Sequence, residues 1–471
     1  MIKKILIANR GEIAVRIVRA CAEMGIRSVA VFTEPDRYAL HLKRADEAHS
    51  LGSDPLAGYL NPHHIVNLAV ETGCDAIHPG YGFLSENPEL AAVCAQRGIR
   101  FIGPSAGVIR RMGDKTEARR AMMAAGVPVT PGSEGNVRDL AAAKKEAARI
   151  GYPVMLKATS GGGGRGIRRC DNEAELARNY DRVISEASKA FGNADVFLEK
   201  CIVAPRHIEV QILADSHGNT IHLFERDCSV QRRNQKLIEV APSPSLTPEQ
   251  RAYIGELAIR AAEAVGYENA GTVEFLMSGN EVYFMEMNTR IQVEHTITEQ
   301  ITGVDIVGEQ IRIASGLALG YRQQDVGYRG YALQLRINAE DPKNNFLPSF
   351  GRISRYYAPG GPGVRVDTAI YTGYDIPPYF DSMCLKLIVW SLRWEDVLNR
   401  ASRALSDMRL QGVKTTAPYY QQILKHPDFR AGKFDTSFVD TNPGLLDYSE
   451  RSRPEDAAIA IAAAIAAHAG L

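Results

Sequence analysis

The first hundred residues alternate short apolar runs with stretches whose apolar side chains recur at helical spacing. Residues 4–8 predict a strand, residues 13–24 repeat apolar side chains on one helical face, and residues 27–33 predict a second strand. A strand–helix–strand opening implies parallel strands joined by a right-handed crossover, so we assign residues 75–78 and 100–102 to the same sheet. The N-terminal part is therefore predicted to be an α/β domain.

The pattern changes after about residue 114. A helix is followed by a predicted strand at 154–157, a glycine run at 160–166 and a charge-rich helical stretch that ends at Gly192. This arrangement is typical of a compact lid.

From residue 203 onward the chain reads mainly as alternating strands, and helices dominate again after Trp394. One helix interrupts the strands at 247–265, where Thr247 is predicted to cap its N-terminus. The tail at 457–467 is rich in alanine and too short to span a membrane. We interpret it as a docked or fraying terminal helix rather than a partner-binding element.

Composition and charge exclude several classes of protein. The 471 residues are 45% hydrophobic and 23% charged, and 55 basic residues balance 55 acidic ones, so nothing indicates a nucleic-acid or membrane surface. The seven cysteines contain no Cys-x-x-Cys pair, and the N-terminus lacks the pattern of a secretory signal. We expect a cytoplasmic protein of two or three domains, with no nucleic acid and no membrane among its partners.

The glycines bear on two kinds of nucleotide site. Only Gly11 stands in the first turn, where a dinucleotide-binding domain needs three glycines, so Glu34 after the second strand is not read as a ribose ligand. In the run at 160–166, Ile167 occupies the place of the P-loop lysine. Its backbone amides could still close on phosphate oxygens, and the alternative is a flexible linker.

Residues 272–294 carry the strongest chemical signal. Two strands flank a turn at 278–280; if the turn has three residues, Glu274 and Glu286 lie diagonally on one face, whereas a two-residue turn puts them on opposite faces. The even positions that follow are polar, and an extended chain would point them the same way. Carboxylates, amides and an arginine along one side of an extended chain are typical of a magnesium and anion site. The alternative is a strand face exposed to solvent. These positions are Asn288, Arg290, Gln292 and Glu294.

Two other segments place polar groups on strands. His207, Glu209 and Gln211 alternate along one strand, and the basic segment 231–236 is flanked by acidic residues, which favours a local anion clamp over a nucleic-acid patch. Arg336 stands on the polar side of another strand, where an exposed arginine is the default interpretation.

The motifs together resemble one family. Residues 4–14, 78–87, 161–166, 286–295 and 336–341 are similar to the biotin carboxylase component of biotin-dependent carboxylases, a branch of the ATP-grasp enzymes, and the likeness extends to about Asp447. The resemblance implies a Rossmann-like N-terminal domain, a mobile glycine-rich lid and a mixed α+β C-terminal domain. It divides the chain into residues 1–113, 114–202 with a linker, 203–447, and the tail 448–471.

The resemblance also implies roles for individual residues. The ATP-binding set comprises Lys115, Lys157, Gly162, Gly163, Gly164, Gly166, Glu199, Lys200, Ile202, His207, Gln231, Asn234 and Leu276. Magnesium or manganese would be bound by Glu274, Glu286 and Asn288. Bicarbonate would be positioned by Lys236, Arg290, Gln292, Val293 and Glu294, with Glu294 as the base. Biotin would meet Tyr81 and Arg336, so the catalytic set is Glu294, Arg290, Arg336 and Lys236.

These residue types suit ATP-dependent carboxylation. A carboxylate base beside cationic side chains lets bicarbonate attack the γ-phosphate of ATP to give carboxyphosphate, and the lid excludes water. The family then transfers carbon dioxide to biotin, with Arg336 stabilising the enolate. Asn234 replaces a histidine found in many members, and Ser160 replaces a glycine.

Partners are implied as well. No Met-Lys dipeptide is present, so biotin must be attached to a separate carrier protein, and a carboxyltransferase must be another chain. The N-terminal and glycine-run residues are most similar to the detached biotin carboxylase chain of two-subunit pyruvate carboxylases; the alternatives are an acetyl-CoA or other acyl-CoA carboxylase, a carboxylate–amine ligase of the ATP-grasp group, and a non-enzymatic nucleotide-binding regulator. Arg16, Arg19 and Glu23 match family dimer contacts, which implies a homodimer, while Pro362 departs from an aromatic residue there.

Overall fold

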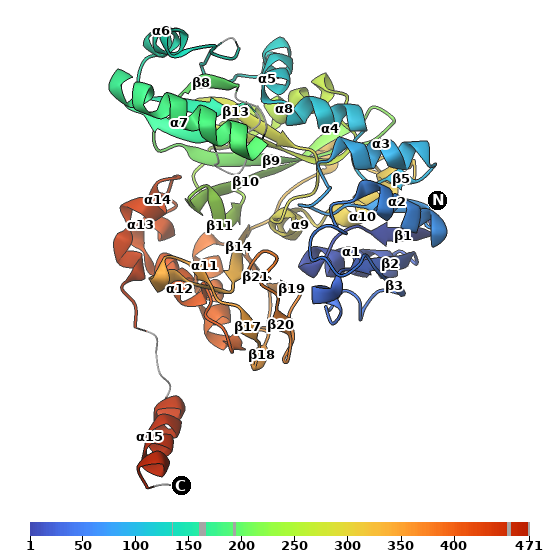
Figure 1. The fold of residues 1–471 in the computed structure, drawn as a ribbon, viewed down its shortest axis with the longest axis vertical. Coiled ribbons are helices and arrows are strands. Elements are labelled where there is room, and N and C mark those ends of the chain that lie inside the picture. The colour runs from blue at the N-terminus through green and yellow to red at the C-terminus, as the bar shows by residue number, and fades with distance from the viewer. Residues whose placement is uncertain (134, 160–165, 192–194, 450–453, 470–471) are drawn as a thin grey trace.

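The computed structural model describes residues 1–471 apart from 134, 160–165, 192–194, 450–453 and 470–471. The glycines at 162–164 that the resemblance assigns to ATP lie outside the described residues. Figure 1 shows the N-terminal part on one side of a long central sheet, the lid above it and the C-terminal helices on the opposite side.

The N-terminal part is a parallel α/β unit, as predicted. Its sheet has the spatial order β3 (Glu47–Ser50), β2 (Arg27–Phe32), β1 (Lys4–Ile7), β4 (Ala76–His78) and β5 (Arg100–Phe101). The helices are α1 (Gly11–Glu23), α2 (Pro62–Glu71), α3 (Pro88–Gln96) and α4 (Ala106–Gly113), with the 3-10 turn η1 (Glu34–Asp36). Strand β3 was not predicted, because its sequence EAHS has no apolar run to reveal it.

The lid is a small layer with its own apolar core. Three antiparallel strands form its sheet, in the order β7 (Ile167–Cys170), β6 (Val154–Ala158) and β8 (Val196–Lys200). Its helices are α6 (Leu140–Ile150) and α7 (Glu173–Phe191), and α5 (Lys115–Ala124) precedes it. Leu156, Leu176 and Leu198 are buried together in this unit. The separate core lets the lid keep its own shape.

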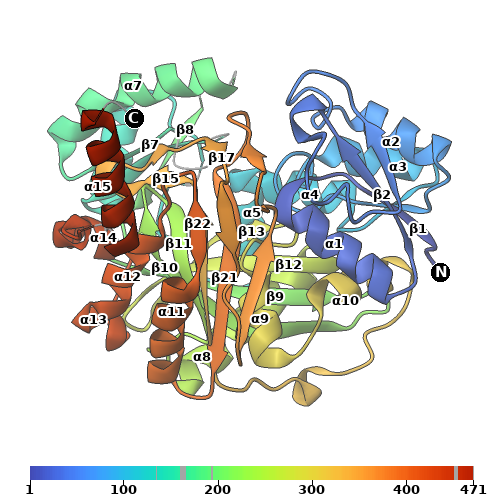
Figure 2. The same cartoon turned by 90° about the horizontal axis from the view of Figure 1, so that it is seen from below.

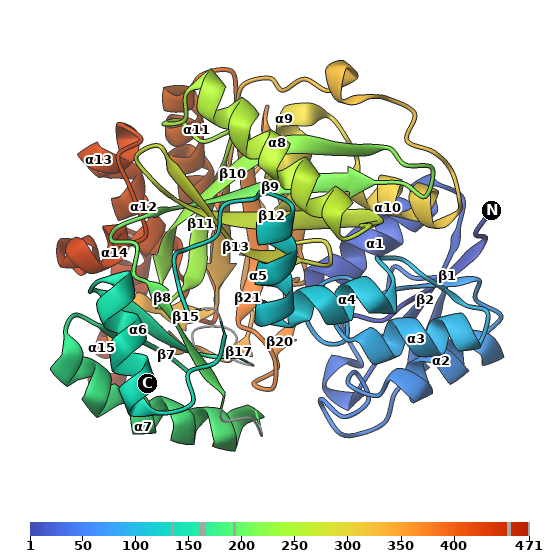
Figure 3. The same ribbon diagram turned by 90° about the horizontal axis from the view of Figure 1, so that it is seen from above.

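An antiparallel sheet of eight strands forms the centre of the molecule. Its order is β13 (Glu281–Asn288), β12 (Asn269–Ser278), β9 (Arg206–Ala214), β10 (Thr220–Arg232), β11 (Gln235–Ala241), β14 (Tyr331–Asn338), β21 (Met383–Ser391) and β19 (Val364–Thr368). Helix α8 (Pro248–Ala264) crosses one face of β9, β10 and β12 (Figure 3). The other helices beside the sheet are α9 (His295–Thr302) and α10 (Ile306–Ala314). The apolar residues of α8 pack on this face, so the polar side chains of the strands gather on the other.

The C-terminal part adds helices that pack against β21, β14 and β10 of this sheet (Figure 2). They are α11 (Trp394–Asp407), α12 (Ala417–Lys425), α13 (Pro427–Arg430) and α14 (Phe438–Thr441). The shorter elements are η2 (Gln323–Asp325), β15 (Glu340–Asp341), η3 (Pro342–Asn344), β16 (Leu347–Pro348), β17 (Gly351–Arg352), β18 (Arg355–Tyr357), β20 (Asp375–Ile376), β22 (Arg409–Gln411) and η4 (Pro443–Leu446).

The alanine-rich tail is helical, as predicted. Helix α15 (Pro454–His468) projects from the body in Figure 1, and Ile459, Ile461 and Ile465 in it are exposed. Among the described residues no helix combines the length and apolarity needed to cross a bilayer.

The predicted cap of α8 is present, which gives a first test. The Thr247 hydroxyl accepts from the Gln250 backbone N–H at 3.2 Å, and the Gln250 side chain accepts from the Thr247 N–H at 3.0 Å. Replacing Thr247 with alanine is expected to destabilise the fold by about 1 kcal/mol. Denaturant unfolding measures the change, and Thr247→Ser should stay near the parent because it keeps the hydroxyl; equal losses in both variants would contradict the cap.

Candidate active site

The hairpin of β12 and β13 holds the two predicted metal-binding carboxylates, in a register that the sequence analysis did not foresee. Ser278 pairs with Glu281, so the turn has two residues rather than three. That turn alone would place Glu274 and Glu286 on opposite faces, but Phe275 pairs with Phe284 and Glu274 with Glu286. The extra residue, Met285, forms a β-bulge that restores both carboxylates to one face. The expected diagonal pair is therefore a directly opposed pair.

Glu274 accepts several hydrogen bonds inside this site. Its Oε1 accepts from Lys236 Nζ at 2.9 Å, from Asn288 Nδ2 at 2.9 Å and from Gln292 Nε2 at 2.7 Å. The ring of His207 lies 2.8 Å from Oε2. Burial opposes ionisation of Glu274, but Lys236 and His207 outweigh it and hold the pKa of this carboxyl well below its usual range.

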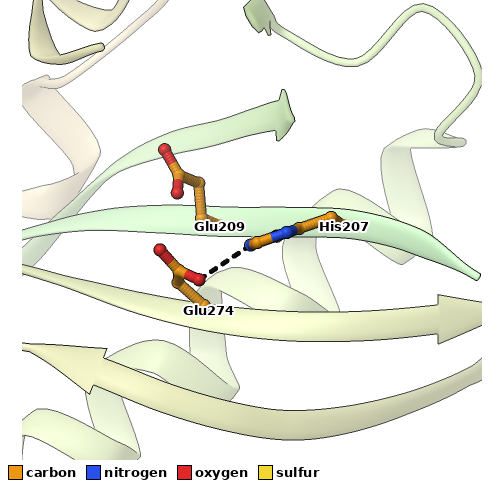
Figure 4. A group of neighbouring side chains, drawn as sticks. All are labelled: His207, Glu209 and Glu274. Atoms are coloured by element: carbon orange, nitrogen blue, oxygen red, sulfur yellow. Dashed lines mark hydrogen bonds and ion pairs between the residues drawn. The ribbon is translucent and has the colours of Figure 1, made fainter. Parts of the chain in front are cut away.

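Figure 4 shows His207 and Glu209 on β9 beside Glu274 on β12, with the His207 ring directed toward the Glu274 carboxylate. Their ligand atoms lie within 4.8 Å of one another, and all three side chains are buried. Glu286 is half-buried, and its pKa is raised by burial and then by the charge of Glu274. Carboxylate and amide oxygens from Glu274, Glu286 and Asn288 are the donors that Mg²⁺ or Mn²⁺ prefers, and two neighbouring carboxylates that repel each other fit a cation between them.

Glu294, the predicted base, lies between two cations. Lys236 Nζ donates to Glu294 Oε1 at 2.7 Å, and Arg336 Nη2 donates to Oε2 at 3.0 Å. Burial would raise the pKa of Glu294, but Lys236, Arg336 and Arg226 together lower it. The carboxylate is therefore ionised at neutral pH, which is the state that a base requires.

Lys236 is surrounded by acids. Besides Glu274 and Glu294 it donates to Glu209 Oε2 at 2.6 Å. Burial favours the neutral amine, but these three carboxylates raise the pKa of Lys236 well above its usual value. The site thus holds a permanent ammonium that an entering anion can contact.

The polar residues after β13 converge without a continuing strand. Strand β13 ends at Asn288, so the prediction of one extended chain through Glu294 was wrong in its backbone. The side chains meet nevertheless, since Arg290 Nη2 donates to Asn288 Oδ1 at 2.8 Å and Gln292 reaches Glu274. The predicted bicarbonate residue Val293 lies in the same segment, and its backbone carbonyl accepts from Lys386.

Three residues that the sequence analysis did not assign support this site. Arg290 Nε donates to Glu86 Oε2 at 2.9 Å, and Arg336 is paired with buried Glu239. Arg226 is fully buried and donates to Gln292 Oε1 at 2.7 Å, to Gln211 and to Glu209. Three consecutive charged residues at 225–227, which follow the apolar pair Leu223 and Phe224 within strand β10, were the available signal for Arg226.

Two of the residues predicted to bind the nucleotide, Lys157 and Glu199, lie on neighbouring strands of the lid, and a third, Lys115, begins helix α5. Lys157 on β6 forms an ion pair with Glu199 on β8. Lys115 begins α5, and its pKa is lowered by burial and by the charge of Lys157, although Glu286 opposes this. The charge of Lys115 therefore interacts both with the lid and with Glu286, one of the predicted metal-binding carboxylates.

The structure also places the other described residues that are predicted to bind the nucleotide. Leu276 pairs with His207 across β12 and β9, and Gln231 is buried near the end of β10. Asn234 lies in a two-residue turn, and its own φ is +63°, a left-handed conformation that asparagine tolerates. The others are less directly placed: Lys200 Nζ donates to the carbonyls of Gly151 and Tyr152, Ile202 is half-buried after β8, and Gly166 has φ +71° at the lid end of the glycine run.

Tyr81, predicted to contact biotin, lies near Glu12 and Arg336. Its hydroxyl donates to Glu12, and its pKa is raised by burial and by the Glu12 charge, while Arg336 lowers it. Arg336 and Tyr81 therefore lie within electrostatic reach of each other.

Comparison with known proteins supports one family. Residues 1–109 match "Biotin carboxylase, N-terminal domain", residues 114–322 match "Carbamoyl-phosphate synthase L chain, ATP binding domain", and residues 334–441 match "Biotin carboxylase C-terminal domain". The chain is 55% identical over 473 residues to the 2-oxoglutarate carboxylase small subunit of Hydrogenobacter thermophilus, covering 100% of both chains. It is 53% identical to a pyruvate carboxylase subunit of Methanothermobacter thermautotrophicus, covering 93% of this chain and 90% of that one.

A solved structure agrees with these relatives. The biotin carboxylase domain dimer of the Hydrogenobacter thermophilus 2-oxoglutarate carboxylase, in complex with MgADP, ADP and bicarbonate, has a TM-score of 0.93 at 56% identity. The match covers 96% of this chain and 100% of that one. The predicted ATP-grasp architecture is confirmed. On its fold, its matched domains and this identity over its full length, the chain belongs to the biotin carboxylase family.

Proposed function

We propose that this chain is the biotin carboxylase subunit of a carboxylase that acts on a 2-oxo acid, with pyruvate as the first candidate acceptor. The relatives named above act on 2-oxoglutarate and on pyruvate, which supports the class of acceptor. The acceptor does not touch the site described here. Experiment must therefore distinguish a 2-oxo acid carboxylase from an acyl-CoA carboxylase. The chain is co-purified with its carboxyltransferase subunit, and the complex is assayed with pyruvate, 2-oxoglutarate and acetyl-CoA.

The observation that carries the proposed reaction is the position of Glu294 between Lys236 and Arg336. Bicarbonate that enters beside these cations shares them with Glu294, so its negative charge raises the pKa of the carboxylate and makes it a better base. Proton removal then lets bicarbonate attack the γ-phosphate to form carboxyphosphate, while Arg290 and Lys236 offset the charge. Gln292, fixed by Arg226, and the Val293 backbone are proposed to orient the anion.

The cation site and the lid serve the nucleotide in this proposal. Glu274, Glu286 and Asn288 would hold Mg²⁺ or Mn²⁺, which when bound offsets phosphate charge. Lys115 and Lys157 would meet the phosphates, His207 and Gln231 the ribose, and residues 199–202 with Leu276 the adenine.

After carboxyphosphate decomposes to carbon dioxide and phosphate, the phosphate takes the ureido proton of biotin. Arg336 is proposed to stabilise the resulting enolate, and Tyr81 to contact biotin on the other side. Biotin would arrive on a separate carrier protein.

Domain division and assembly are also proposals. The division at 1–113, 114–202, 203–447 and 448–471 is supported by the separate cores of the N-terminal sheet and the lid. A homodimer is supported by the exposed pair Arg19 and Glu23 on α1, which a two-fold axis could pair reciprocally. Arg16 is already bound to Glu299 within the chain.

The test is ATP hydrolysis with and without bicarbonate. A biotin carboxylase is expected to cleave ATP faster when bicarbonate is added, and then to carboxylate free biotin. A carboxylate–amine ligase would show no bicarbonate dependence, and a non-enzymatic regulator would bind ATP without turnover.

Asn234 gives a smaller prediction for nucleotide binding. Asn234→His is expected to tighten ATP binding by about 0.5–1.5 kcal/mol, since an imidazole could add one hydrogen bond at the ribose and histidine also tolerates left-handed backbone. Calorimetric titration with a non-hydrolysable ATP analogue measures it. Asn234→Gly is the control, because it fits the turn but adds no donor; unchanged affinity in the histidine variant would show that this position does not face the ribose.

A further inference from the structure

A buried lysine outside the proposed catalytic set contacts the loop that carries the base. Lys386 on β21 has a side chain with 0% exposure, and its Nζ donates to the Val293 carbonyl at 2.9 Å. Val293 is the residue directly before Glu294. The same Nζ lies 3.0 Å from Glu12 Oε1 and 4.0 Å from Asp367 Oδ2. We call the segment of Val293 and Glu294 the base loop. The Lys386 ammonium therefore connects the base loop to Glu12 and Asp367, which come from other parts of the chain.

Glu12 continues this chain of contacts to Tyr81. It lies in the first turn of α1, which packs beside β19 and the edge of the central sheet (Figure 2). Its Oε1 accepts the Tyr81 hydroxyl as well as the Lys386 ammonium, and its side chain is only 2% exposed. A shared acceptor atom fixes the tyrosine hydroxyl relative to the lysine.

The strand register brings the other biotin-side residue to the same place. Lys386 is directly opposite Arg336 across β21 and β14, so both side chains leave the sheet on the same face. Arg336 reaches Glu294 Oε2, while Lys386 holds the preceding carbonyl. The contacts thus run from Arg336 through Glu294 and Lys386 to Glu12 and Tyr81.

We propose that Lys386 and Glu12 are positioning residues that fix Tyr81 of the N-terminal domain relative to Arg336 and the base loop, and so set the width of the biotin-binding gap. This rests on the proposed function of Tyr81 and Arg336. A buried ion pair contributes little net stability compared with apolar replacements, so one whose two ends touch the proposed substrate-binding groups is better explained by geometry than by stability.

A double-mutant cycle tests the proposal with free biotin as the varied substrate. Tyr81→Phe and Lys386→Met are each expected to lower kcat/KM for biotin by about tenfold, mainly through KM. If Lys386 acts through Tyr81, the double variant should be no worse than the poorer single variant. Additive losses, near a hundredfold, would overturn the proposal.

The controls separate this role from folding and from the wider function. Lys4→Met removes a comparable lysine, which also contacts a carboxylate and a backbone carbonyl (Glu47 and Thr72) but lies away from the site, and kcat/KM for biotin should not change. If Lys386→Met does not fold, Glu12→Gln replaces it in the cycle, because glutamine keeps the shape of the side chain. The losses from Glu12→Gln and Tyr81→Phe must then also be non-additive. A wild-type protein without bicarbonate-dependent ATP cleavage would refute the proposed function itself, whereas an active wild type with additive variants refutes only the positioning role.

Discussion

Arg336→Ser is expected to lower biotin carboxylation by about 10²–10³-fold while bicarbonate-dependent ATP cleavage continues. The reason is the stage at which Arg336 acts, because its proposed partner is the biotin enolate that forms after carboxyphosphate. Removing a charge-assisted donor from such a site costs about 2.7–4 kcal/mol of transition-state stabilisation. Lys236 still contacts Glu294 at 2.7 Å, so the base remains ionised without the arginine. Parallel assays of ADP release and carboxybiotin formation measure the two steps.

Glu294→Gln is the contrasting variant for this prediction. The amide cannot remove the bicarbonate proton, so ATP cleavage and biotin carboxylation should fall together. The substitution keeps the side-chain shape. If Arg336→Ser instead loses ATP cleavage to the same degree as Glu294→Gln, Arg336 also positions bicarbonate and the division of roles proposed here is wrong.

Glu286→Gln is expected to abolish turnover and to leave the fold intact. Glu286 faces Glu274 across the hairpin, and a neutral amide weakens the cation site that the two carboxylates form. Its pKa is raised by burial and by repulsion from Glu274, so removing the charge relieves strain on the folded state rather than adding any. ATP turnover measured over a range of Mg²⁺ concentrations, beside thermal unfolding, separates the two effects.

Glu281→Gln provides the matched control. Glu281 begins the same strand but is exposed and lies beside the turn. The activity and Mg²⁺ dependence of the Glu281→Gln variant should therefore equal those of the parent. Near-normal activity of Glu286→Gln at ordinary Mg²⁺ would contradict the assignment of this carboxylate.

The sequence alone was enough for most of the N-terminal elements and for the strands that carry the candidate site residues. Local periodicity identified the parallel opening, the capped helix at Thr247 and the strands that carry Glu274 and Glu286. The family resemblance then supplied the ATP-grasp architecture. These features depend on residues close together in the chain, where side-chain type and spacing act directly on the backbone.

The tertiary structure decided the register and the long-range pairs. The bulge at Met285 reverses the faces that a two-residue turn would give, and one extra residue in a strand leaves no periodic signal strong enough to read. Arg290 meets Glu86 and Lys386 meets Glu12 across more than 200 residues of chain. Such ion pairs form only when elements distant in the sequence pack together, and the pair of Lys386 with Glu12 is buried from water, so no local pattern specifies them.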